Sequence, residues 1–304
     1  MYKIAFFGYS YSGKTTLFRK ITGKTDDTYD PLKPNVGIGR FRDGVLERIA
    51  EISGAKKVVY PEFEFFDFKG VPAAIGFSDD YLKHLFETEI IVCIVKNFDG
   101  ESEPEKEAGS LLMELIFYDT ERIENLLSRA DSAYKGLSQQ QVKVLEAGLK
   151  LLTEEKLLNS LDEQDKKLLK GIEILTIKPV FVYVNGTTKK PFTLPLPHIN
   201  QEIETLDEEL FYNSIIQALS LITFYTIKGD IAQGWLVPES FTAKQAAGKV
   251  HQDIEKGFIR AATLHFKDYI EIKDWHKAKT SGLLKFLGPN SNIADKDIVE
   301  FYFH

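Results

Sequence analysis

Residues 8–15 read Gly-Tyr-Ser-Tyr-Ser-Gly-Lys-Thr and fit the pattern G-x-x-x-x-G-K-[ST]. The motif follows the apolar run 2–7 and opens a helical pattern that stops near Gly23, which is the strand–loop–helix setting of a phosphate-binding loop. Glycines let such a loop curl until its N–H groups and the helix N-terminus converge on phosphate oxygens. This feature predicts an α/β P-loop NTPase.

The motif also predicts a role for each loop residue. Lys14 would bridge the outer phosphates, a catalytic role, and the Thr15 hydroxyl would ligate Mg²⁺. The residues that we expect to bind the nucleotide are Gly8, Tyr11, Ser12, Gly13, Lys14, Thr15 and Thr16.

Three further apolar runs are typical of buried strands, at 58–66, 90–95 and 179–184. They are nearly continuous and are separated by helical stretches, which indicates a mainly parallel sheet with helices on both faces. Ligands bind at the carboxyl ends of such strands, so the residues that end the runs are candidate site residues. Cys93, the single cysteine, lies within the run 90–95 and is expected in the core.

Asp67 and Gly70 form a D-x-x-G element directly after the run 58–66. We predict that Asp67 holds the magnesium ion, directly or through a water, and that the Gly70 N–H meets the γ-phosphate. The next residue, Val71, cannot orient a water molecule as the glutamine of many GTPases does. Slow hydrolysis is therefore expected.

A long segment, residues 103–171, has helical periodicity and no strand pattern. Two residue pairs within it, Ser138 with Gln141 and Ser160 with Glu163, have the form of N-terminal capping boxes. The segment predicts an α-helical hairpin inserted into the nucleotide-binding domain.

The pattern of apolar residues changes again after residue 219, where short strand patterns surround one helical stretch at 243–254. This mixture predicts a compact C-terminal α+β domain. The predicted parts are residues 1–102 with 172–219 for the nucleotide-binding domain, 103–171 for the helical insertion, and 220–304 for the C-terminal domain.

Charge and composition exclude several other classes of protein. The net charge of −7 argues against a chain that coats nucleic acid over its whole surface. Residues 220–304 carry eleven Lys and Arg against ten Asp and Glu, so the acidity belongs to the preceding part and a C-terminal nucleic-acid contact stays open. A single cysteine excludes an internal disulfide framework, and no apolar run reaches the roughly 18 residues of a membrane span. We expect a cytoplasmic protein without a membrane partner.

Several stretches resemble the YchF-type Obg-like ATPases, a branch of the translation-factor-related GTPases. They are residues 33–37, 46–50, 56–59 and 64–67, and the long run 246–261. The long run resembles the signature of that family's TGS domain, a ubiquitin-like β-grasp module. The resemblance implies a G domain, a helical insertion and a TGS domain, and a slow nucleotide switch that acts near the ribosome, with ribosome or RNA as the partner of the TGS-like domain.

The chain departs from the family pattern at positions that concern switching. Tyr11 stands where the family has an asparagine linked to monovalent-cation assistance, and Pro31 stands at the switch I threonine, with Thr28 nearby. Residues 72–77 are shorter and more apolar than the family's glycine-rich loop. These losses concern hydrolysis more than phosphate binding.

Base recognition departs from the family pattern as well. Asn185, after the run 179–184, matches the first residue of the family's N-x-x-E element, but residues 186–188 supply no carboxylate at that spacing. The acceptor for the N–H groups of guanine is therefore missing. We expect Asn185 to touch the base, and the family analogy favours ATP, with binding of GTP or of both nucleotides left open.

The main hypothesis is a magnesium-dependent switch that binds ATP or GTP. The alternatives are a nucleotide-binding scaffold that has lost turnover and a small-molecule phosphotransferase. The six histidines show no metal-ligand spacing, and His251 is expected to pack or to make a helix-end hydrogen bond. Lys249, Lys256 and Arg260 either contact RNA phosphates or form a solvated face.

Overall fold

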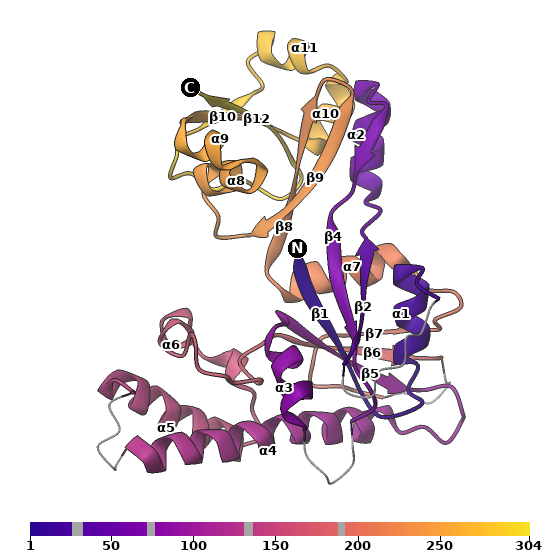
Figure 1. Cartoon of the computed structure of the whole chain (residues 1–304). Helices are drawn as coiled ribbons and strands as arrows, with labels where there is room; N and C mark the ends of the chain where they lie inside the picture. Colours follow the sequence, from indigo (N-terminus) through magenta and orange to yellow (C-terminus); the bar gives the residue numbers. More distant parts are fainter. Residues whose placement is uncertain (26–32, 72–76, 131–135, 188–191) are drawn as a thin grey trace. The chain divides into compact units, whose positions relative to one another are not determined.

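The computed structural model describes residues 1–25, 33–71, 77–130, 136–187 and 192–304. These residues form two compact units, each assembled from two stretches of the chain (Figure 1). The first unit comprises Met1–Gly39 and Glu64–Leu206, and the second comprises Arg40–Phe63 and Asp207–His304. No helix within the described ranges is long and apolar enough to span a bilayer.

The sheet of the first unit has the strand order β2-β4-β1-β5-β6-β7. Its strands are β1 (Tyr2–Phe7), β2 (Asn35–Arg40), β4 (Glu62–Asp67), β5 (Ile90–Lys96), β6 (Val180–Asn185) and β7 (His198–Gln201). The pairs β1/β5, β5/β6 and β6/β7 are parallel, and β6 is buried at every position, as its continuous apolar run predicted. Cys93 in β5 is fully buried, and burial raises the pKa of its thiol to about 12, so it is the core residue expected.

Several helices of the first unit begin or end at residues that stabilise helix termini. They are α1 (Lys14–Thr22), α3 (Asp79–Phe86), α4 (Pro104–Ala130), α5 (Gln139–Thr153) and α6 (Glu163–Leu168). Helix α1 ends at Gly23, and Ser138 and Gln141 form the predicted capping box of α5. The second predicted box is wrong: the cap of α6 is Asp162 and not Ser160, because the Asp162 carboxylate accepts two backbone N–H groups of the first turn.

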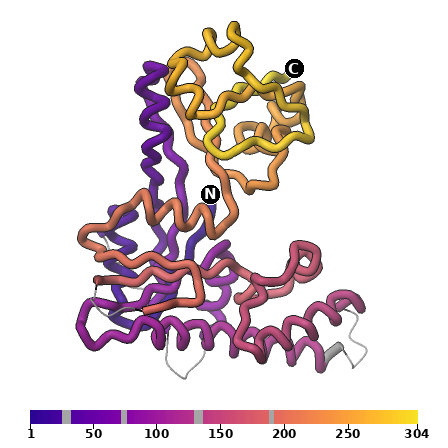
Figure 2. Tube along the Cα trace, turned by 180° about the vertical axis from the view of Figure 1, so that it is seen from behind, coloured from indigo at the N-terminus to yellow at the C-terminus, as the bar shows by residue number. Residues whose placement is uncertain are grey.

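Helix α4 belongs to the core of the first unit. Its residues Ala108, Leu111 and Leu115 are buried in the same cluster as residues of the sheet, and α5 lies beside α4, as Figure 2 shows. Midway along α4, the fully buried Asp119 accepts two successive backbone N–H groups that precede β6, at 2.9 and 2.6 Å. The helical segment 103–171 is therefore packed into the nucleotide-binding fold from its first turns.

The sheet of the second unit has the strand order β11-β10-β12-β8-β9-β3. Its strands are β3 (Lys57–Val59), β8 (Leu221–Lys228), β9 (Ile231–Pro238), β10 (Phe258–His265), β11 (Lys285–Leu287) and β12 (Asp297–Phe303). Its helices are α2 (Gly44–Ser53), α7 (Glu208–Ala218), α8 (Ala243–Val250), α9 (Gln252–Lys256), α10 (Phe266–Ile272) and α11 (Trp275–Thr280). The last strand, β12, pairs in parallel with β8 at the centre of the sheet. Two apolar clusters complete this α+β unit. One contains residues of α8, and the other contains residues of α2, α10 and α11.

The strand predicted at 58–66 is divided between the two sheets. Lys57–Val59 form β3 and pair in parallel with β9, whereas β4 starts at Glu62 in the other sheet. Pro61 lies between them, and proline has no N–H with which to continue a strand ladder. The helical stretch predicted at 243–254 is likewise divided, into α8 and α9, at the extended residue His251.

Asp43 connects the inserted residues 40–63 to the C-terminal part of the second unit. Its buried carboxylate caps α2 by accepting the Val45 N–H at 2.9 Å, and it accepts the hydroxyl of the buried Tyr225 in β8 at 2.5 Å. Burial raises the pKa of Asp43, while the Tyr225 and Val45 hydrogen bonds oppose that rise. The division predicted from the sequence assigns residues 40–63 and 207–219 to the nucleotide-binding domain, whereas both stretches belong to the second unit.

We expect Tyr225→Phe to destabilise the second unit by about 1–3 kcal/mol, because it keeps the ring packing and leaves a buried carboxylate oxygen without its donor. Urea unfolding would measure this. Tyr60→Phe is the matched control, since its hydroxyl also donates to a carboxylate, Glu47, but at the surface, and should change the free energy of unfolding by at most about 0.5 kcal/mol. Equal effects of the two substitutions would contradict the assignment.

Candidate functional site

The loop at 8–13 connects β1 to α1 with the backbone packed too closely for side chains at two positions. A Cβ at Gly8 would lie 2.5 Å from the carbonyl oxygen of Ile94, and a Cβ at Gly13 would collide with the Asn185 carboxamide. Gly13 is also the N-cap of α1, with φ 100° and no side chain capping the helix. The N-terminus of α1 is therefore open toward the loop, as a phosphate site requires.

Lys14, at the start of α1, is buried, with 5% of the residue's surface exposed. Its ammonium group donates to the carbonyl oxygen of Tyr9 at 2.7 Å, so it reaches back across the loop. Burial lowers the pKa of Lys14 to about 8, although the carboxylates of Asp67 and Glu107 act in the opposite direction. The loop thus surrounds a cation that is only weakly compensated by the protein itself.

Thr15 and Asp67 lie in direct contact. The Thr15 hydroxyl donates to Asp67 Oδ2 at 2.8 Å, and Asn35 Nδ2 in β2 donates to the same oxygen at 3.2 Å. Asp67 ends β4 and is 4% exposed. Helix α1, strand β4 and strand β2 therefore bring a hydroxyl, a carboxylate and a carboxamide together beside the loop.

Gly70 and Val71, which follow the end of β4, also contact the loop. A Cβ at Gly70 would lie 2.6 Å from the backbone nitrogen of Ser10, and the Val71 N–H donates to the carbonyl oxygen of Gly8 at 3.0 Å. The Val71 side chain is packed in the core of the first unit. Residues 72–76, like Thr28 and Pro31, lie outside the described residues.

Asn185 holds the loop from the end of β6. Its carboxamide is buried and donates to the carbonyl oxygen of Ser12 at 3.0 Å. Two residues further on, the Thr187 hydroxyl donates to the carboxylate of Glu202, which follows β7, at 2.7 Å. Thr188 is outside the described residues.

The predicted site residues separate into two groups. Gly8, Ser12, Gly13, Lys14, Thr15, Asp67, Gly70 and Asn185 lie together around the loop. Tyr11 is 94% exposed with φ 65°, and Thr16 is exposed on α1, so neither side chain is part of that group.

Two residues beside the loop, Asn35 and Glu107, are not among the predicted site residues. Asn35 belongs to the stretch 33–37 that carried the family resemblance, and this was the signal available for it. Glu107, on the first turn of α4, accepts the Lys96 N–H at 3.3 Å and is brought near Lys14 only by packing of α4 on the sheet. His251, as expected, makes a helix-end hydrogen bond: its Nδ1 accepts the Asp253 N–H at 3.1 Å.

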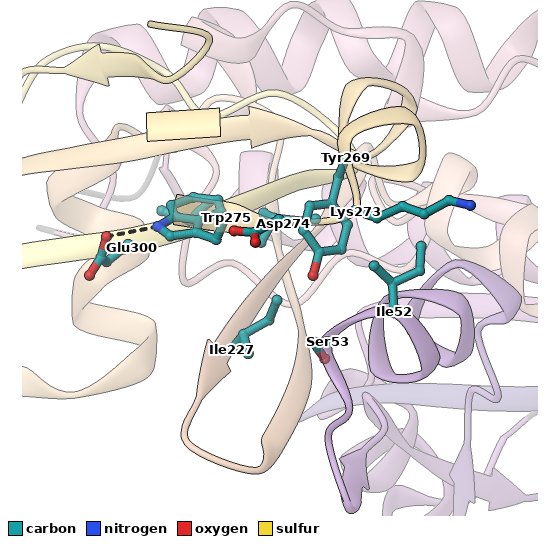
Figure 3. Close-up of a pocket in the computed structure, with 10 residues that line it drawn as sticks. Ile52, Ser53, Ile227, Tyr269, Lys273, Asp274, Trp275 and Glu300 are labelled. Carbon is teal, nitrogen blue, oxygen red and sulfur yellow. Dashed lines mark hydrogen bonds between the residues drawn. The ribbon is translucent and has the colours of Figure 1, made fainter. Parts of the chain in front are cut away.

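The second unit contains a separate cavity of about 380 Å³, drawn in Figure 3. Apolar side chains including Ile52, Ile227 and Ile298 line it together with the rings of Tyr269 and Trp275. At one end, the Trp275 indole N–H donates to a carboxylate oxygen of Glu300 at 3.1 Å. The cavity shares no residue with the loop site.

A sheet whose β1/β5, β5/β6 and β6/β7 pairs are parallel, a glycine-bounded loop and an uncapped helix N-terminus define the first unit as a P-loop NTPase fold of the G-domain type. The structure of the YchF GTPase of Schizosaccharomyces pombe matches this fold with a TM-score of 0.79 and 19% identity, over 99% of this chain and 97% of that chain.

Comparison of the sequence with known proteins agrees with the fold. Residues 221–304 match the family model YchF-GTPase_C, described as a "Protein of unknown function (DUF933)". The whole chain is similar to the ribosome-binding ATPase YchF of Escherichia coli O157:H7, with 27% identity over 360 positions, 100% of this chain and 99% of the relative. The Bacillus subtilis (strain 168) protein of that name is 26% identical over 96% of each chain. The predicted resemblance to the YchF-type family is confirmed.

The buried Lys14 predicts a pH dependence of phosphate binding. Phosphate oxygens pair with the ammonium form, and with a pKa of about 8 this form predominates at about pH 7.5 and falls to roughly a tenth at about pH 9. We expect the affinity for a fluorescent ATP analogue to fall about five- to tenfold over this interval. In Lys14→Arg, whose guanidinium stays charged, any remaining affinity should be constant, and a pH-independent wild type would contradict the assignment.

Proposed function

We propose that the protein binds a purine nucleotide, ATP or GTP, together with Mg²⁺, hydrolyses it slowly, and acts as a regulatory switch on the ribosome. The observation that supports this most directly is the contact of Thr15 with Asp67 beside the buried Lys14. A hydroxyl and a carboxylate suit a magnesium ion, and a buried ammonium suits phosphates. The relatives in Escherichia coli and Bacillus subtilis bear the name ribosome-binding ATPase.

The loop residues fit a bound triphosphate. Ser12 Oγ is buried and makes no hydrogen bond within the described residues, and the N-terminus of α1 carries no side-chain cap. These groups, with Lys14 and the Gly70 N–H, would hold the phosphates. Ordering of the loop by Asn185 keeps their positions fixed before a ligand arrives.

The residues that would hold Mg²⁺ are Thr15 and Asp67, which are already within hydrogen-bond distance of one another. The ion supplies charge neutralisation for the phosphates when it is bound. Asn35, through its bond to Asp67 Oδ2, fixes the orientation of that carboxylate. The fit rests on oxygen donors alone, which is the donor set that Mg²⁺ prefers.

Slow hydrolysis is supported by Val71. In many GTPases a glutamine after the D-x-x-G element orients the attacking water, whereas the Val71 side chain is apolar and 5% exposed. The protein therefore lacks, at this position, a side chain that activates water. The backbone N–H of Val71 donates to the carbonyl oxygen of Gly8.

The ribosomal part of the proposal concerns the second unit. Residues 221–304 of this unit match the YchF-GTPase_C model and include the TGS-like run 246–261. We propose that they form a β-grasp module that contacts ribosome or RNA. A cytoplasmic location would follow from that partner. The names of the bacterial relatives favour ATP, whereas the similar Schizosaccharomyces pombe structure bears the name GTPase, so the proposal keeps both nucleotides.

Titration with a fluorescent ATP or GTP analogue and Mg²⁺ tests the assignment. Lys14→Ala should lower the affinity at least about a hundredfold, because it removes a charge that is paired with phosphate in a buried site. Lys20→Ala, on the exposed part of the same helix, should bind like the wild type. Unchanged affinity in Lys14→Ala, with an unfolding midpoint equal to that of the wild type, would refute the nucleotide site.

A scaffold that binds nucleotide without turnover is the second candidate, and Val71 is the observation that favours it. Single-turnover hydrolysis of labelled ATP separates the two candidates. A slow phase in the wild type that is absent from Lys14→Ala is the expected result for a switch. A wild-type rate equal to that background would establish the scaffold instead.

A further inference from the structure

The cavity drawn in Figure 3 is lined by both stretches of the chain that form the second unit. Ile52 in α2 belongs to residues 40–63, whereas Ile227 in β8 and Glu300 in β12 belong to the C-terminal stretch. The volume of about 380 Å³ falls within the range of sites that bind small molecules. A molecule bound there would contact both stretches at once.

Tyr269 places an unpaired hydroxyl group in the cavity. The residue is 2% exposed, yet its hydroxyl makes no hydrogen bond within the part of the chain that the structure describes. Figure 3 shows this hydroxyl directed toward the space between Ile227 and Ile52. Burial, and to a smaller extent the Asp274 carboxylate, raises the pKa of Tyr269, so the hydroxyl keeps its proton. Buried polar groups are rarely left without a partner, and this one is available to a ligand.

Glu300 supplies a second open polar group. Its Oε2 accepts the Trp275 indole N–H at 3.1 Å and the Tyr302 hydroxyl at 2.8 Å, so two donors fix the orientation of the carboxylate. Its Oε1 accepts no hydrogen bond from any residue that the structure describes. An ionised carboxylate only accepts hydrogen bonds, so the open oxygen requires a donor from the ligand.

The charged residues that line the cavity favour a cation as the ligand. Among the described lining residues, Asp274 and Glu300 are anionic and Lys273 is cationic. Figure 3 shows the Lys273 side chain extended away from the aromatic rings. Asp274 caps α11 by accepting the Lys277 N–H at 3.0 Å, and such backbone hydrogen bonds lower its pKa, so it stays ionised. An anionic ligand would therefore meet two carboxylates, whereas an ammonium group would be attracted by them.

Apolar side chains and aromatic rings form most of the remaining lining. Ile52, Ile227 and Ile298 offer aliphatic surface, and Tyr269 and Trp275 offer rings. Aliphatic surface binds an apolar stem, and aromatic faces attract organic cations. The cavity thus combines an open carboxylate oxygen, an unpaired hydroxyl and an apolar wall.

We propose that this cavity binds a small organic amine whose apolar or aromatic stem carries a second polar atom. The ammonium group donates to Glu300 Oε1, the stem lies against the isoleucines and the Tyr269 ring, and the second polar atom accepts the Tyr269 hydroxyl. This site goes beyond the proposed nucleotide switch, because none of its residues belongs to the loop at 8–13. Since the amine binds only the folded unit, it also stabilises the packing of residues 40–63 on the C-terminal stretch.

Tyramine is the probe, because it carries an ammonium group and a hydroxyl group at opposite ends of an aromatic stem. Saturation-transfer NMR with the full chain compares it with tyrosol, which has an alcohol in place of the amine, and with phenethylamine, which lacks the hydroxyl. We expect tyrosol to bind about tenfold more weakly, because it loses the charge-assisted bond to Glu300. We expect phenethylamine to bind about fivefold more weakly, because it leaves the Tyr269 hydroxyl unpaired.

Variants of the two polar residues identify the contacts. Glu300→Gln removes the charge and should weaken tyramine binding about tenfold, with tyrosol binding nearly unchanged. Tyr269→Phe should weaken tyramine binding about fivefold, with phenethylamine binding unchanged. Glu271→Gln is the matched control, since Glu271 is an exposed glutamate of α10 that does not line the cavity, and it should bind like the wild type.

Ile227→Phe distinguishes the cavity from the exposed surface of Glu300. The larger side chain takes up volume in the cavity and should abolish tyramine binding while both polar groups remain. Equal affinities for tyramine and tyrosol, or wild-type affinity in Glu300→Gln, would overturn the proposal. Wild-type affinity in Ile227→Phe would do so as well, by showing that tyramine pairs with a carboxylate outside the cavity. Urea unfolding confirms that each variant is folded, and an unchanged affinity for the ATP analogue keeps this test independent of the nucleotide site.

Discussion

The burial of the Lys14 ammonium is the constraint on which the rest of the first unit depends. A cation removed from water is costly unless polar groups surround it. The protein provides one carbonyl at hydrogen-bond distance and two carboxylates that act through space, and this is too little to restore the ordinary pKa. The loop glycines, the open N-terminus of α1 and the end of β4 all lie around this ammonium group.

Much of this site follows from the sequence because its parts are local. The residues 8–15 lie next to one another, and each of Asp67 and Asn185 ends a continuous apolar run, so the rule that parallel strands end at one edge is sufficient to bring them together. Asn35 and Glu107 could not be assigned a role in this way, because their positions depend on how β2 and α4 pack against other strands. The contact of Thr187 with Glu202 likewise joins segments that are separate in the sequence.

The errors of the sequence reading have physical causes. The prediction of one strand at 58–66 is wrong because Pro61 interrupts the run, and an apolar pattern alone does not indicate to which sheet each half belongs. The observed cap of α6 lies two residues after the predicted Ser160, because the Asp162 carboxylate accepts two N–H groups of the first turn. Helix α2 was not predicted, and its contact with β8 through Asp43 is a long-range bond that no local pattern encodes.

Residues 40–63 belong to the second unit although both of their sequence neighbours belong to the first. This determines how the chain can be divided into fragments. A fragment that begins at Asp207, or at the start of the match at 221, would lack α2 and β3, which contribute buried Leu46 and Ile49 and an edge strand to the second unit. Such a fragment would expose apolar surface and an unpaired strand edge, both of which favour aggregation. A circular permutant or a fusion that restores residues 40–63 beside β9 is the form in which the C-terminal unit can be isolated.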